Sequence, residues 1–572
     1  MNLLNRFFWV SLFFLLISCQ SHGPKEMSLN GSWNFLADND ITEPQVLTSD
    51  FTQWTHLPVP GNWDTQEDYS TYTGKGYYQR NFNIPADWKG KQVRIKFDAV
   101  YQSAKVWLNG QLLGTHVGGY TPFEFNISEI AHYNGENSLV VQADNTYSRG
   151  AWWPWGGISR SVSLLCNESV RIAYQHITAT PDFERKSVDF MVNIVLENNA
   201  NTSIQMQLQT MIASKALQKK VELAAGAHQT IKFEYTAPLT DFELWDMHHP
   251  NLYHLETKLI GEDCVWDVKQ DHFGVRKIEA IGEQLFLNNK PIRLNGMNRV
   301  HDHPNFGNTE PDKLIKMDMD GIKALGGHFS RLMHAPLSKN LLNYCDSIGY
   351  LVIQEIPVWG DDDPQTFAHN PQTEQWMREM IQRDYNHPCV IGWSVGNELR
   401  DPVAPWGEKS LTKDQYAYVD SMLDFLTSQD SSRLKTYVSI TAYGKYTDQT
   451  NEPYEKLDLI CINSYGNAVG LVEKTHEKFP GKPIFLSEIG RKQIGGKPES
   501  ELSEQLVNDL NILREYPYLV GYALWSYNDY RSGYKGTPKS GFREWGVVDA
   551  YRQPKKAFAQ IKQINDFWGG EE

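Results

Sequence analysis

Hydrophobic and polar positions alternate in short segments along the first half of the chain. Segments 93–97 and 104–108 show this alternation, and the second leads directly into Asn109-Gly110. A period of two residues predicts strands with one buried face, and a following Asn-Gly pair predicts a hairpin turn. The pattern predicts an all-β sandwich over residues 29–165. It continues in segment 188–196, which predicts a smaller immunoglobulin-like β-sandwich over residues 166–276.

From residue 277 onward, apolar stretches of strand length alternate with longer stretches of helical character. The predicted strands are 292–298, 328–333, 350–355, 390–395, 436–440, 457–463, 483–488 and 520–525. Alternating strands and helices indicate a parallel sheet, and this number of repeats predicts a TIM (β/α)8 barrel over residues 277–572. In that fold the carboxyl ends of the strands form the active site, so polar residues there are candidate site residues.

Two of these apolar strands lead to a glutamate. One gives Asn397-Glu398, and the other gives Ser487-Glu488. A single buried glutamate at a strand end could be an ion-pair partner. A pair of carboxyl groups on two strands of one barrel supplies what glycoside hydrolysis requires, a proton donor and a nucleophile or base.

Composition narrows the class of ligand. The formal net charge is −15, which argues against nucleic acid as a partner and favours a neutral or weakly charged substrate. Aromatic residues make up 12% of the chain, including 18 Trp, and such side chains can stack on the apolar face of a sugar. Any individual Trp can equally fill a core.

The first residues resemble a bacterial lipoprotein signal. Arg6 precedes an almost wholly apolar run at 7–17, too short for a membrane span, and the run ends in Ser18-Cys19. We predict a signal peptide at 1–18, lipidation of Cys19, a tether at 19–28 and a periplasmic or outer-membrane-anchored protein. The alternative is ordinary secretion with an incidental cysteine. The other cysteines lack metal-ligand spacing and are predicted to be small buried hydrophobic residues.

Several motifs give the chain a specific resemblance. They are Phe-Gly-Val-Arg at 273–276, Leu-Asn-Gly-Met-Asn-Arg at 294–299, Asn-His-Pro at 386–388 and Ser-Val-Gly-Asn-Glu at 394–398. From about residue 29 to 567 the chain resembles glycoside hydrolase family 2, which contains β-galactosidases, β-glucuronidases and β-mannosidases. The resemblance implies a jelly-roll, sugar-binding-like first sandwich. It also implies that Glu398 is the acid/base and Glu488 the nucleophile of a retaining exo-β-glycosidase.

The resemblance also implies a set of substrate-binding residues. They are Asn397, which would bind the sugar 2-OH, Tyr465, which would bond the nucleophile, Trp525 as the floor of the subsite, His334 and His387 as the pocket lining, and Asn463, Arg299, His301 and Asp302. Alternatives remain at several positions. Asn397 could cap a turn, and the histidines and Trp525 could be core residues.

The resemblance also bears on metal and substrate. His301 stands where β-galactosidases of the family carry a glutamate ligand to Mg²⁺, so we predict no obligatory metal or cofactor. The loop at 531–540 lacks the Asn-x-Lys motif of the β-glucuronidases, which favours β-galactosides over β-glucuronides and β-mannosides. Arg531, Lys535, Lys539 and Arg543 could still bind an anionic sugar by another geometry. A sugar-binding lipoprotein without catalysis is a further alternative, and no pattern indicates an oligomeric state.

Overall fold

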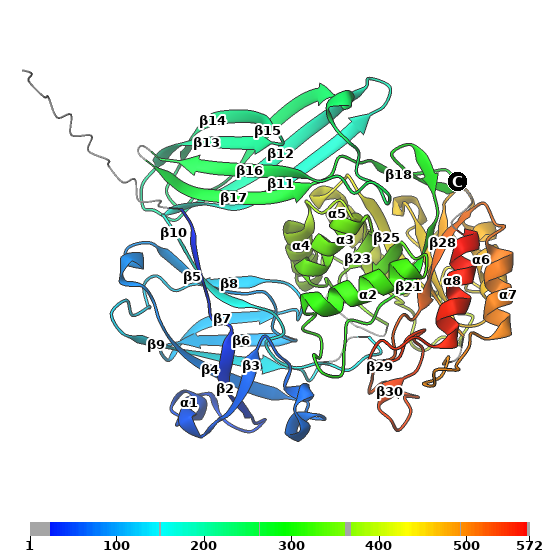
Figure 1. Cartoon of the computed structure of the whole chain (residues 1–572), viewed down its shortest axis with the longest axis horizontal. Helices are drawn as coiled ribbons and strands as arrows, with labels where there is room; N and C mark the ends of the chain where they lie inside the picture. The colour runs from blue at the N-terminus through cyan, green and yellow to red at the C-terminus, as the bar shows by residue number, and fades with distance from the viewer. Residues whose placement is uncertain (1–22, 148–149, 262–263, 361–367, 492, 569–572) are drawn as a thin grey trace, which may run out of the picture.

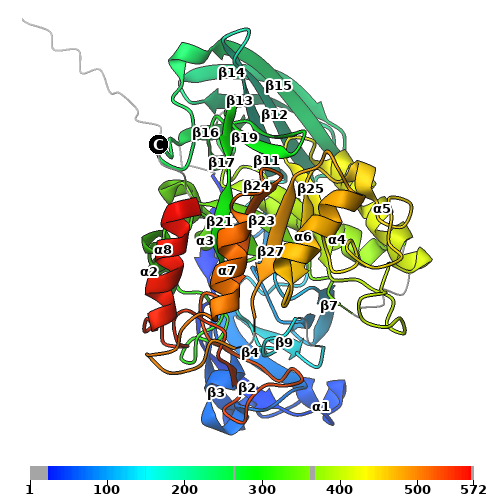
Figure 2. The same cartoon turned by 90° about the vertical axis from the view of Figure 1, so that its right-hand side faces the viewer.

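The computed structural model describes residues 23–147, 150–261, 264–360, 368–491 and 493–568. Two β-sandwiches lie on one side of Figure 1 and a barrel surrounded by helices lies on the other. Figure 2, turned by 90°, places the first sandwich below the barrel and the second above it. The predicted architecture of two sandwiches and a TIM barrel is confirmed.

The first sandwich consists of two antiparallel sheets, ordered β1-β10-β5-β8 and β3-β2-β4-β9-β6-β7. The strands are β1 (Lys25–Ser28), β2 (Gly31–Ala37), β3 (Thr55–Val59), β4 (Lys75–Asn83), β5 (Gln92–Phe97), β6 (Ser103–Leu108), β7 (Gln111–Val117), β8 (Phe123–Asn126), β9 (Glu136–Asp144) and β10 (Val162–Asn167). The predicted alternation buries Val93, Ile95 and Phe97 in the core. Short helical segments occur in the loops between the strands of the first sandwich. They are α1 (Glu43–Leu47), η1 (Phe51–Gln53), η2 (Trp63–Thr65), η3 (Glu67–Tyr69) and η4 (Ala86–Trp88).

The predicted tether at 19–28 is wrong at its end. Lys25–Ser28 forms β1, which pairs antiparallel with β10 from Lys25 opposite Cys166 to Ser28 opposite Ser163. The hydrophobic pattern does not predict this strand, because β1 is an edge strand that is stabilised by backbone hydrogen bonds to β10 rather than by buried side chains. Strand β10 also extends to Asn167, so the division predicted after residue 165 cuts through it.

The second sandwich packs the sheet β11-β12-β15 against the sheet β14-β13-β16-β17. The strands are β11 (Val170–Asp182), β12 (Ser187–Asn198), β13 (Ile204–Ile212), β14 (Lys215–Leu223), β15 (His228–Pro238), β16 (Tyr253–Ile260) and β17 (Val265–Phe273), with η5 (Leu239–Asp241) between β15 and β16. Strand β12 alternates buried and half-buried positions along its whole length, as expected for a strand with one face in the core. A small sheet, β18 (Ile278–Ile281), β19 (Gln284–Leu287) and β20 (Lys290–Ile292), leads into the barrel.

The barrel closes from β21 to β28 with parallel strands. They are β21 (Leu294–Asn298), β22 (Phe329–Leu332), β23 (Leu351–Glu355), β24 (Val390–Asn397), β25 (Leu434–Ser439), β26 (Ile460–Ser464), β27 (Ile484–Ile489) and β28 (Leu519–Trp525), each within or next to a predicted segment. The outer elements are α2 (Asp312–Ala324), α3 (Lys339–Ile348), α4 (Pro371–Asp384), α5 (Lys413–Gln429), η6 (Tyr454–Lys456), α6 (Ala468–Lys478), α7 (Glu504–Leu513) and α8 (Lys556–Trp568). Apart from the half-buried Lys435 of β25, the barrel strands are buried at every position, which explains why strands such as β24 and β28 are predominantly apolar.

The loop that follows β28 ties the barrel to the first sandwich. It carries the short strands β29 (Tyr530–Arg531) and β30 (Phe542–Arg543). The Arg531 guanidinium lies 4.1 Å from the ring centroid of Trp153 and donates to the carbonyl oxygens of Asp64, at 3.3 Å, and Ser70. This contact places the first sandwich against the carboxyl ends of the barrel strands.

The structure tests only part of what the sequence predicts for the N-terminal residues. The predicted signal peptide and Cys19 lie outside the described residues. Among the helices that are described, none has the length and apolar character needed to cross a bilayer. Cys166, Cys345, Cys389 and Cys461 are buried, as predicted, whereas Cys264 is partly exposed.

Candidate active site

The two predicted glutamates lie at the carboxyl ends of β24 and β27. Glu398 follows the last residue of β24 and adopts a left-handed conformation, with φ of 57°. Its Oε1 accepts a hydrogen bond of 2.8 Å from Nδ2 of Asn463, on β26. Asn463 Oδ1 in turn accepts a bond of 2.8 Å from the hydroxyl of Ser487, which precedes Glu488. The Asn463 side chain therefore joins the carboxyl group of Glu398 to the residue that precedes Glu488.

Glu488 is buried and receives two strong donors. The Tyr465 hydroxyl donates to Oε2, as predicted for this tyrosine, and the Arg331 guanidinium donates to Oε1. Arg331 lies on β22 and is fully buried; its other terminal nitrogen donates to Glu355 at 2.8 Å. A guanidinium shared by two carboxylates holds both in fixed positions and favours their ionised forms.

Arg331 is a functional residue that the sequence predictions missed. It lies inside a short apolar strand, one residue before its end, in the sequence Phe-Ser-Arg-Leu. A charged residue within a strand that is buried at every position needs a partner, because an isolated buried charge is very costly. That signal could have placed Arg331 among the candidate site residues.

The ionisation of the two glutamates follows from burial and from these donors. Burial raises the pKa of Glu398 above its ordinary value, against the hydrogen bond from Asn463. Burial also raises the pKa of Glu488, against the charge of Arg331 and the bond from Tyr465. Such a pair titrates as a unit. Since Glu488 has two strong donors and Glu398 has an amide, we assign the negative charge to Glu488 and the shared proton to Glu398.

Aromatic rings form one wall of the site, and it includes His334 and Trp525, whose predicted roles as pocket lining and subsite floor stay predictions. The His334 ring stacks on Trp152 at 5.2 Å and on Trp525 at 6.5 Å between centroids. Its Nδ1 bonds to Glu355 at 2.8 Å, and its Nε2 lies 4.0 Å from Oε1 of Glu488. Trp525 itself donates to Tyr530 at 3.0 Å. Trp152, in the loop before β10, shows that the first sandwich contributes to this wall.

Asn397 is the last residue of β24 and is fully buried. Its Oδ1 accepts a bond of 3.2 Å from Asn463. Its Nδ2 has no hydrogen-bond partner among the described residues. The alternative role in which Asn397 caps a turn finds no support in these contacts. Asn397 directly precedes Glu398, and binding of a sugar hydroxyl by Asn397 stays a prediction.

Two predicted site residues are structural. His387 precedes β24 and therefore lies at the opposite end of the barrel from Glu398; its Nδ1 bonds to Asp346 at 2.5 Å. The prediction that His387 lines the sugar pocket is wrong. His387 is close to β24 in sequence, but it lies before the strand begins, whereas the site lies where the strand ends. Arg299 lies at the carboxyl end of β21, the same end of the barrel as Glu398. However, its side chain is buried and forms ion pairs of 2.7 Å with Glu310 and with Asp318. The prediction that Arg299 binds substrate is therefore also wrong.

His301 and Asp302 are buried beside the aromatic wall. The His301 ring lies edge-on to Trp152, at 5.5 Å between centroids, and burial lowers its pKa to about 4. Burial raises the pKa of Asp302 to about 7, and its Oδ2 accepts the backbone N–H of Arg531 at 2.9 Å. His303, the third polar residue of this stretch, stacks on Phe306.

These residues do not fit the Mg²⁺ site of family β-galactosidases. Mg²⁺ requires several oxygen ligands in octahedral geometry, whereas His301 is neutral and surrounded by aromatic rings. Within the described ranges, three or more His, Cys, Asp or Glu side chains do not gather anywhere in a way that could hold a metal ion.

Arg543 lies near the site, in the loop after β28. Its guanidinium carbon is 5.4 Å from the ring of Trp545 and 5.6 Å from the ring of Tyr534. Trp545 packs against Tyr465, the donor to Glu488. The Nε of Arg543 has no hydrogen-bond partner, and no acidic side chain pairs with its guanidinium, among the described residues. Arg543 is therefore a cation held by aromatic rings near Tyr465 and Glu488.

Comparison with known proteins agrees with this architecture. Three family descriptions match consecutive parts of the chain: the sugar binding domain of glycosyl hydrolases family 2 at residues 27–168, the family 2 domain at 170–276, and the family 2 TIM barrel domain at 278–566. The chain belongs to glycosyl hydrolases family 2.

Individual relatives carry two different names. A β-galactosidase of Thermoanaerobacter pseudethanolicus is 32% identical over 399 residues, covering 65% of this chain and 52% of the relative. A β-glucuronidase of Streptococcus agalactiae is 24% identical over 604 residues, covering 94% of this chain and 95% of the relative. The structure of Bacteroides uniformis β-glucuronidase 2, covalently bound to cyclophellitol-6-carboxylate aziridine, superposes with a TM-score of 0.82 at 25% identity, covering 96% and 70%. This chain thus spans about half the length of the β-galactosidase relative.

Proposed function

We propose that this protein is a retaining exo-β-glycosidase that removes terminal non-reducing β-linked sugars by double displacement, with β-galactosides as its first substrate class. The observation that carries the reaction is the pair Glu398 and Glu488, since one carboxyl group has an amide donor and the other a guanidinium and a phenol. Glu488 attacks the anomeric carbon while Glu398 protonates the leaving oxygen. Glu398 then deprotonates the water that hydrolyses the glycosyl ester.

The β-galactoside proposal draws on two features. The relative with the higher identity is named a β-galactosidase. Arg531, a candidate for binding a sugar carboxylate, is already engaged by Trp153 and by the carbonyl oxygens of Asp64 and Ser70. A neutral sugar requires no additional cation in the subsite.

A second candidate class is the β-uronides, and Arg543 favours it. A guanidinium without an acidic partner suits a carboxylate, which it can bind through two parallel hydrogen bonds. The Streptococcus agalactiae relative, which matches along nearly its whole length, is named a β-glucuronidase. Sulfated sugars present the same chemistry to Arg543.

A panel of p-nitrophenyl β-glycosides tests both candidates at once. We expect the highest kcat/KM on the β-galactoside and a β-configured first product. A preference for the β-glucuronide or β-galacturonide that Arg543→Met abolishes, while Arg543→Lys retains part of it, would establish the second candidate instead. Absence of turnover on every member would favour the sugar-binding lipoprotein.

Arg331 gives a prediction on pH. The acidic fall in kcat/KM reports protonation of Glu488, and the Arg331 charge lowers the pKa of that group. Arg331→Met should therefore move the acidic limb to higher pH and reduce kcat/KM at neutral pH by about 100-fold, the scale of one lost charge-stabilising contact. Arg331→Lys, which keeps the charge, is the control and should leave the limb nearer its original position. An unchanged limb in Arg331→Met would contradict the assigned ion pair.

The metal prediction can be tested directly. Because His301 replaces a carboxylate ligand and lies among aromatic rings, EDTA should leave most of the activity in place. The measurement is kcat/KM on an aryl β-glycoside before and after chelation, with Mg²⁺ added back as the control. Complete loss that Mg²⁺ restores would show that other oxygen ligands bind the ion.

Localisation is also a proposal. We propose that Cys19 is lipidated, so that the precursor enters the detergent phase with the membrane fraction and Cys19→Ser becomes soluble or mislocalised. The soluble form should keep its specific activity, because the catalytic residues lie in a barrel far along the chain from the anchor. A truncation used for this test should begin before Lys25, since β1 belongs to the first sandwich. Wild-type protein that is freely soluble after processing would indicate ordinary secretion.

A further inference from the structure

Three large apolar side chains are exposed on two adjoining loops at the carboxyl end of the barrel. Val403 and Trp406 lie in the loop after β24, and Tyr446 lies in the loop after β25; 73% of the Trp406 side chain is exposed. The backbone N–H of Lys445 donates to the carbonyl oxygen of Gly407 at 3.0 Å, which joins the two loops. A single exposed apolar residue is common, but a group on adjoining loops indicates a binding surface.

The loop that carries Trp406 is held in a defined conformation. Its two ends are joined by a hydrogen bond of 3.0 Å from the backbone N–H of Asp401 to the carbonyl oxygen of Ser410. The buried Lys409 ammonium donates to the carbonyl oxygen of Asp401 at 2.9 Å and lies 5.8 Å from the ring centroid of Trp406. Because ordering a side chain on binding costs free energy, an exposed ring on a loop that is already ordered is well suited to receive a ligand.

Both loops lead back to the acid/base. The Arg400 guanidinium donates to the carbonyl oxygen of Glu398 at 3.2 Å, and its central carbon lies 6.0 Å from the ring centroid of Trp406. In the second loop, Tyr443 donates to the carbonyl oxygen of Asn463 at 3.0 Å. The side chain of Asn463 in turn bonds to Glu398. A single side chain, that of Arg400, therefore spans the distance between Trp406 and the backbone of Glu398.

The proposed reaction determines which part of a substrate approaches these loops. Glu398 protonates the oxygen that links the terminal sugar to the leaving group, so the leaving group lies beside Glu398. The terminal sugar lies deeper, because its anomeric carbon must meet Glu488, which is buried. A chain of sugars that leaves the pocket past Glu398 therefore approaches the loops after β24 and β25.

We propose that Trp406 is the platform of a leaving-group subsite, on which a sugar unit of a β-linked oligosaccharide stacks. A pyranose has an apolar face of C–H groups, and the indole is a broad, flat apolar surface that can cover it. Val403 and Tyr446 extend this surface on the same two loops. The proposal rests on the proposed glycosidase function, and it adds that the substrate is the end of a sugar chain rather than a small glycoside.

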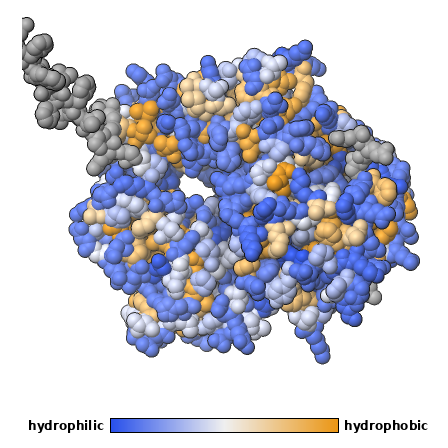
Figure 3. Space-filling model, in the orientation of Figure 1, coloured by the Kyte–Doolittle hydropathy of each residue, from blue (hydrophilic) through white to orange (hydrophobic). Residues whose placement is uncertain are grey.

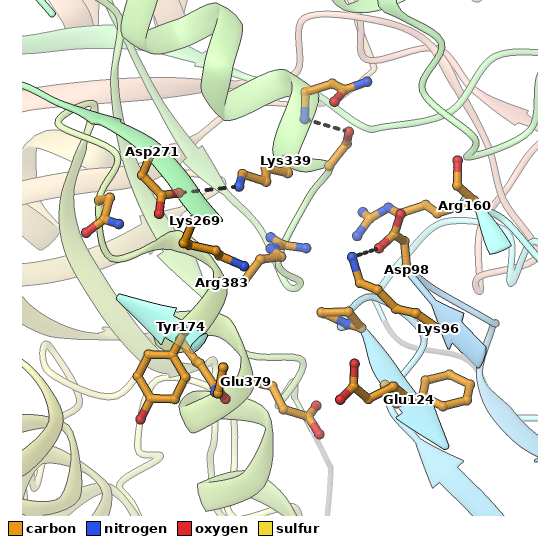
Figure 4. Close-up of a pocket in the computed structure, with 18 of the residues that line it drawn as sticks. Lys96, Asp98, Glu124, Arg160, Tyr174, Lys269, Asp271, Lys339, Glu379 and Arg383 are labelled. Atoms are coloured by element: carbon orange, nitrogen blue, oxygen red, sulfur yellow. Dashed lines mark hydrogen bonds and ion pairs between the residues drawn. The ribbon is translucent and has the colours of Figure 1, made fainter. Parts of the chain in front are cut away.

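A second candidate for receiving the leaving group is a cavity of about 830 Å³ where the three domains meet. Figure 3 shows the surface hollowed between the sandwiches and the barrel, and Figure 4 shows this junction cavity lined by charged side chains of both signs beside Tyr174. Its barrel residues come from the loops after β21 and β22 and from α3 and α4, whereas the acid/base follows β24. The position of Glu398 therefore favours the Trp406 surface.

Kinetics on substrates with long and short leaving groups test this proposal. The probes are β-1,4-galactotriose and methyl β-galactoside, or the corresponding β-glucuronides if the aryl glycoside panel selects uronides. Trp406→Ala should lower kcat/KM on the trisaccharide about tenfold, the scale of one lost aromatic contact, mainly through a higher KM. The loss on the methyl glycoside should be much smaller, because a methyl group does not reach the ring. Trp406→Phe, which keeps a smaller ring, should lie between wild type and Trp406→Ala.

Two control variants attribute the effect to this surface. Phe567→Ala also removes a ring that is 61% exposed and lies beside a guanidinium, that of Arg514 at 5.3 Å. Arg514 directly follows α7 and precedes β28, so this ring lies at the opposite end of the barrel. Tyr174→Ala removes the ring at the junction cavity. Neither control should change kcat/KM on the trisaccharide.

Calorimetry separates failure of the subsite from failure of the reaction. In Glu488→Gln, which should not turn substrate over, we expect the trisaccharide to bind more tightly than the methyl glycoside. Adding Trp406→Ala should remove most of this difference. Absence of wild-type turnover on both probes would contradict the glycosidase function, and the binding comparison would still decide the subsite. Equal binding of the trisaccharide with and without Trp406, an equal kinetic loss on both probes, or a loss in Tyr174→Ala instead, overturns the proposal.

Discussion

Glu488→Gln should reduce kcat by about 10⁴-fold or more, the scale seen when an activated nucleophile is removed. The substitution keeps the shape of the side chain and removes the attacking charge. Arg331 and Tyr465 would still contact the amide, so the ring wall and the barrel should remain intact. The measurement is kcat on an aryl β-glycoside, with circular dichroism and thermal unfolding to verify the fold. A loss of this size without a loss of structure identifies a chemical role.

Covalent labelling separates the nucleophile from a residue that only binds substrate. A 2-deoxy-2-fluoro-β-glycoside should form a stable ester with wild-type protein, and peptide mass spectrometry should place it on Glu488. Glu488→Gln should not be labelled. Glu477→Gln, at an exposed position on α6, is the matched control and should react normally. Wild-type turnover in Glu488→Gln, or an ester on another residue, would show that this assignment is wrong.

The sequence was sufficient to predict the architecture because its hydrophobic pattern is unambiguous. Strand β12 has a strict period of two, which only a sandwich strand with one buried face explains. Strands β24 and β28 are continuous apolar runs, which a closed parallel barrel explains. The edge strand β1 escaped prediction, since four residues paired by backbone hydrogen bonds leave little trace in side-chain pattern.

The candidate site was only partly predictable, and the failures have a common physical cause. A strand end can be located in a sequence, but the partners of a side chain across the barrel cannot. Arg299 and Arg331 are both buried arginines of the barrel, yet one is enclosed by Glu310 and Asp318 and the other reaches Glu488. Spacing along the chain does not distinguish these cases.

The contribution of the first sandwich was missed for a similar reason. Trp152 lies more than a hundred positions before the barrel begins, and its ring reaches His334 because the first sandwich packs against the barrel, through the loop after β28 and through contacts such as that of Thr121 with Glu379. The packing of the first sandwich on the barrel is therefore part of the site. A barrel without the first sandwich would lack Trp152 and therefore part of the aromatic wall of the site.

Glu398→Ala should show the behaviour expected when a general acid is removed, a loss of about 10²- to 10⁴-fold that depends on the leaving group. Substrates with alkyl leaving groups should lose most, because their oxygen must be protonated as the bond breaks. Activated aryl glycosides should lose least in the first step and should then accumulate glycosyl enzyme, because no base remains to activate water. The measurement is kcat/KM across a series of leaving groups, with burst kinetics for the activated members.

Azide provides the decisive test of the same variant, because a small anionic nucleophile needs no base and fits the space that the carboxyl group leaves. Added azide should restore turnover of activated substrates and give a β-glycosyl azide, since two inversions at the anomeric carbon retain its configuration. Burial raises the pKa of Glu398, so in wild-type protein the alkaline fall in kcat/KM should lie above the range of an ordinary glutamate; in Glu398→Ala that limb should disappear. Glu398→Gln, which fills the space, should not respond to azide. An α-configured azide would require an inverting reaction and would remove the nucleophilic role assigned to Glu488.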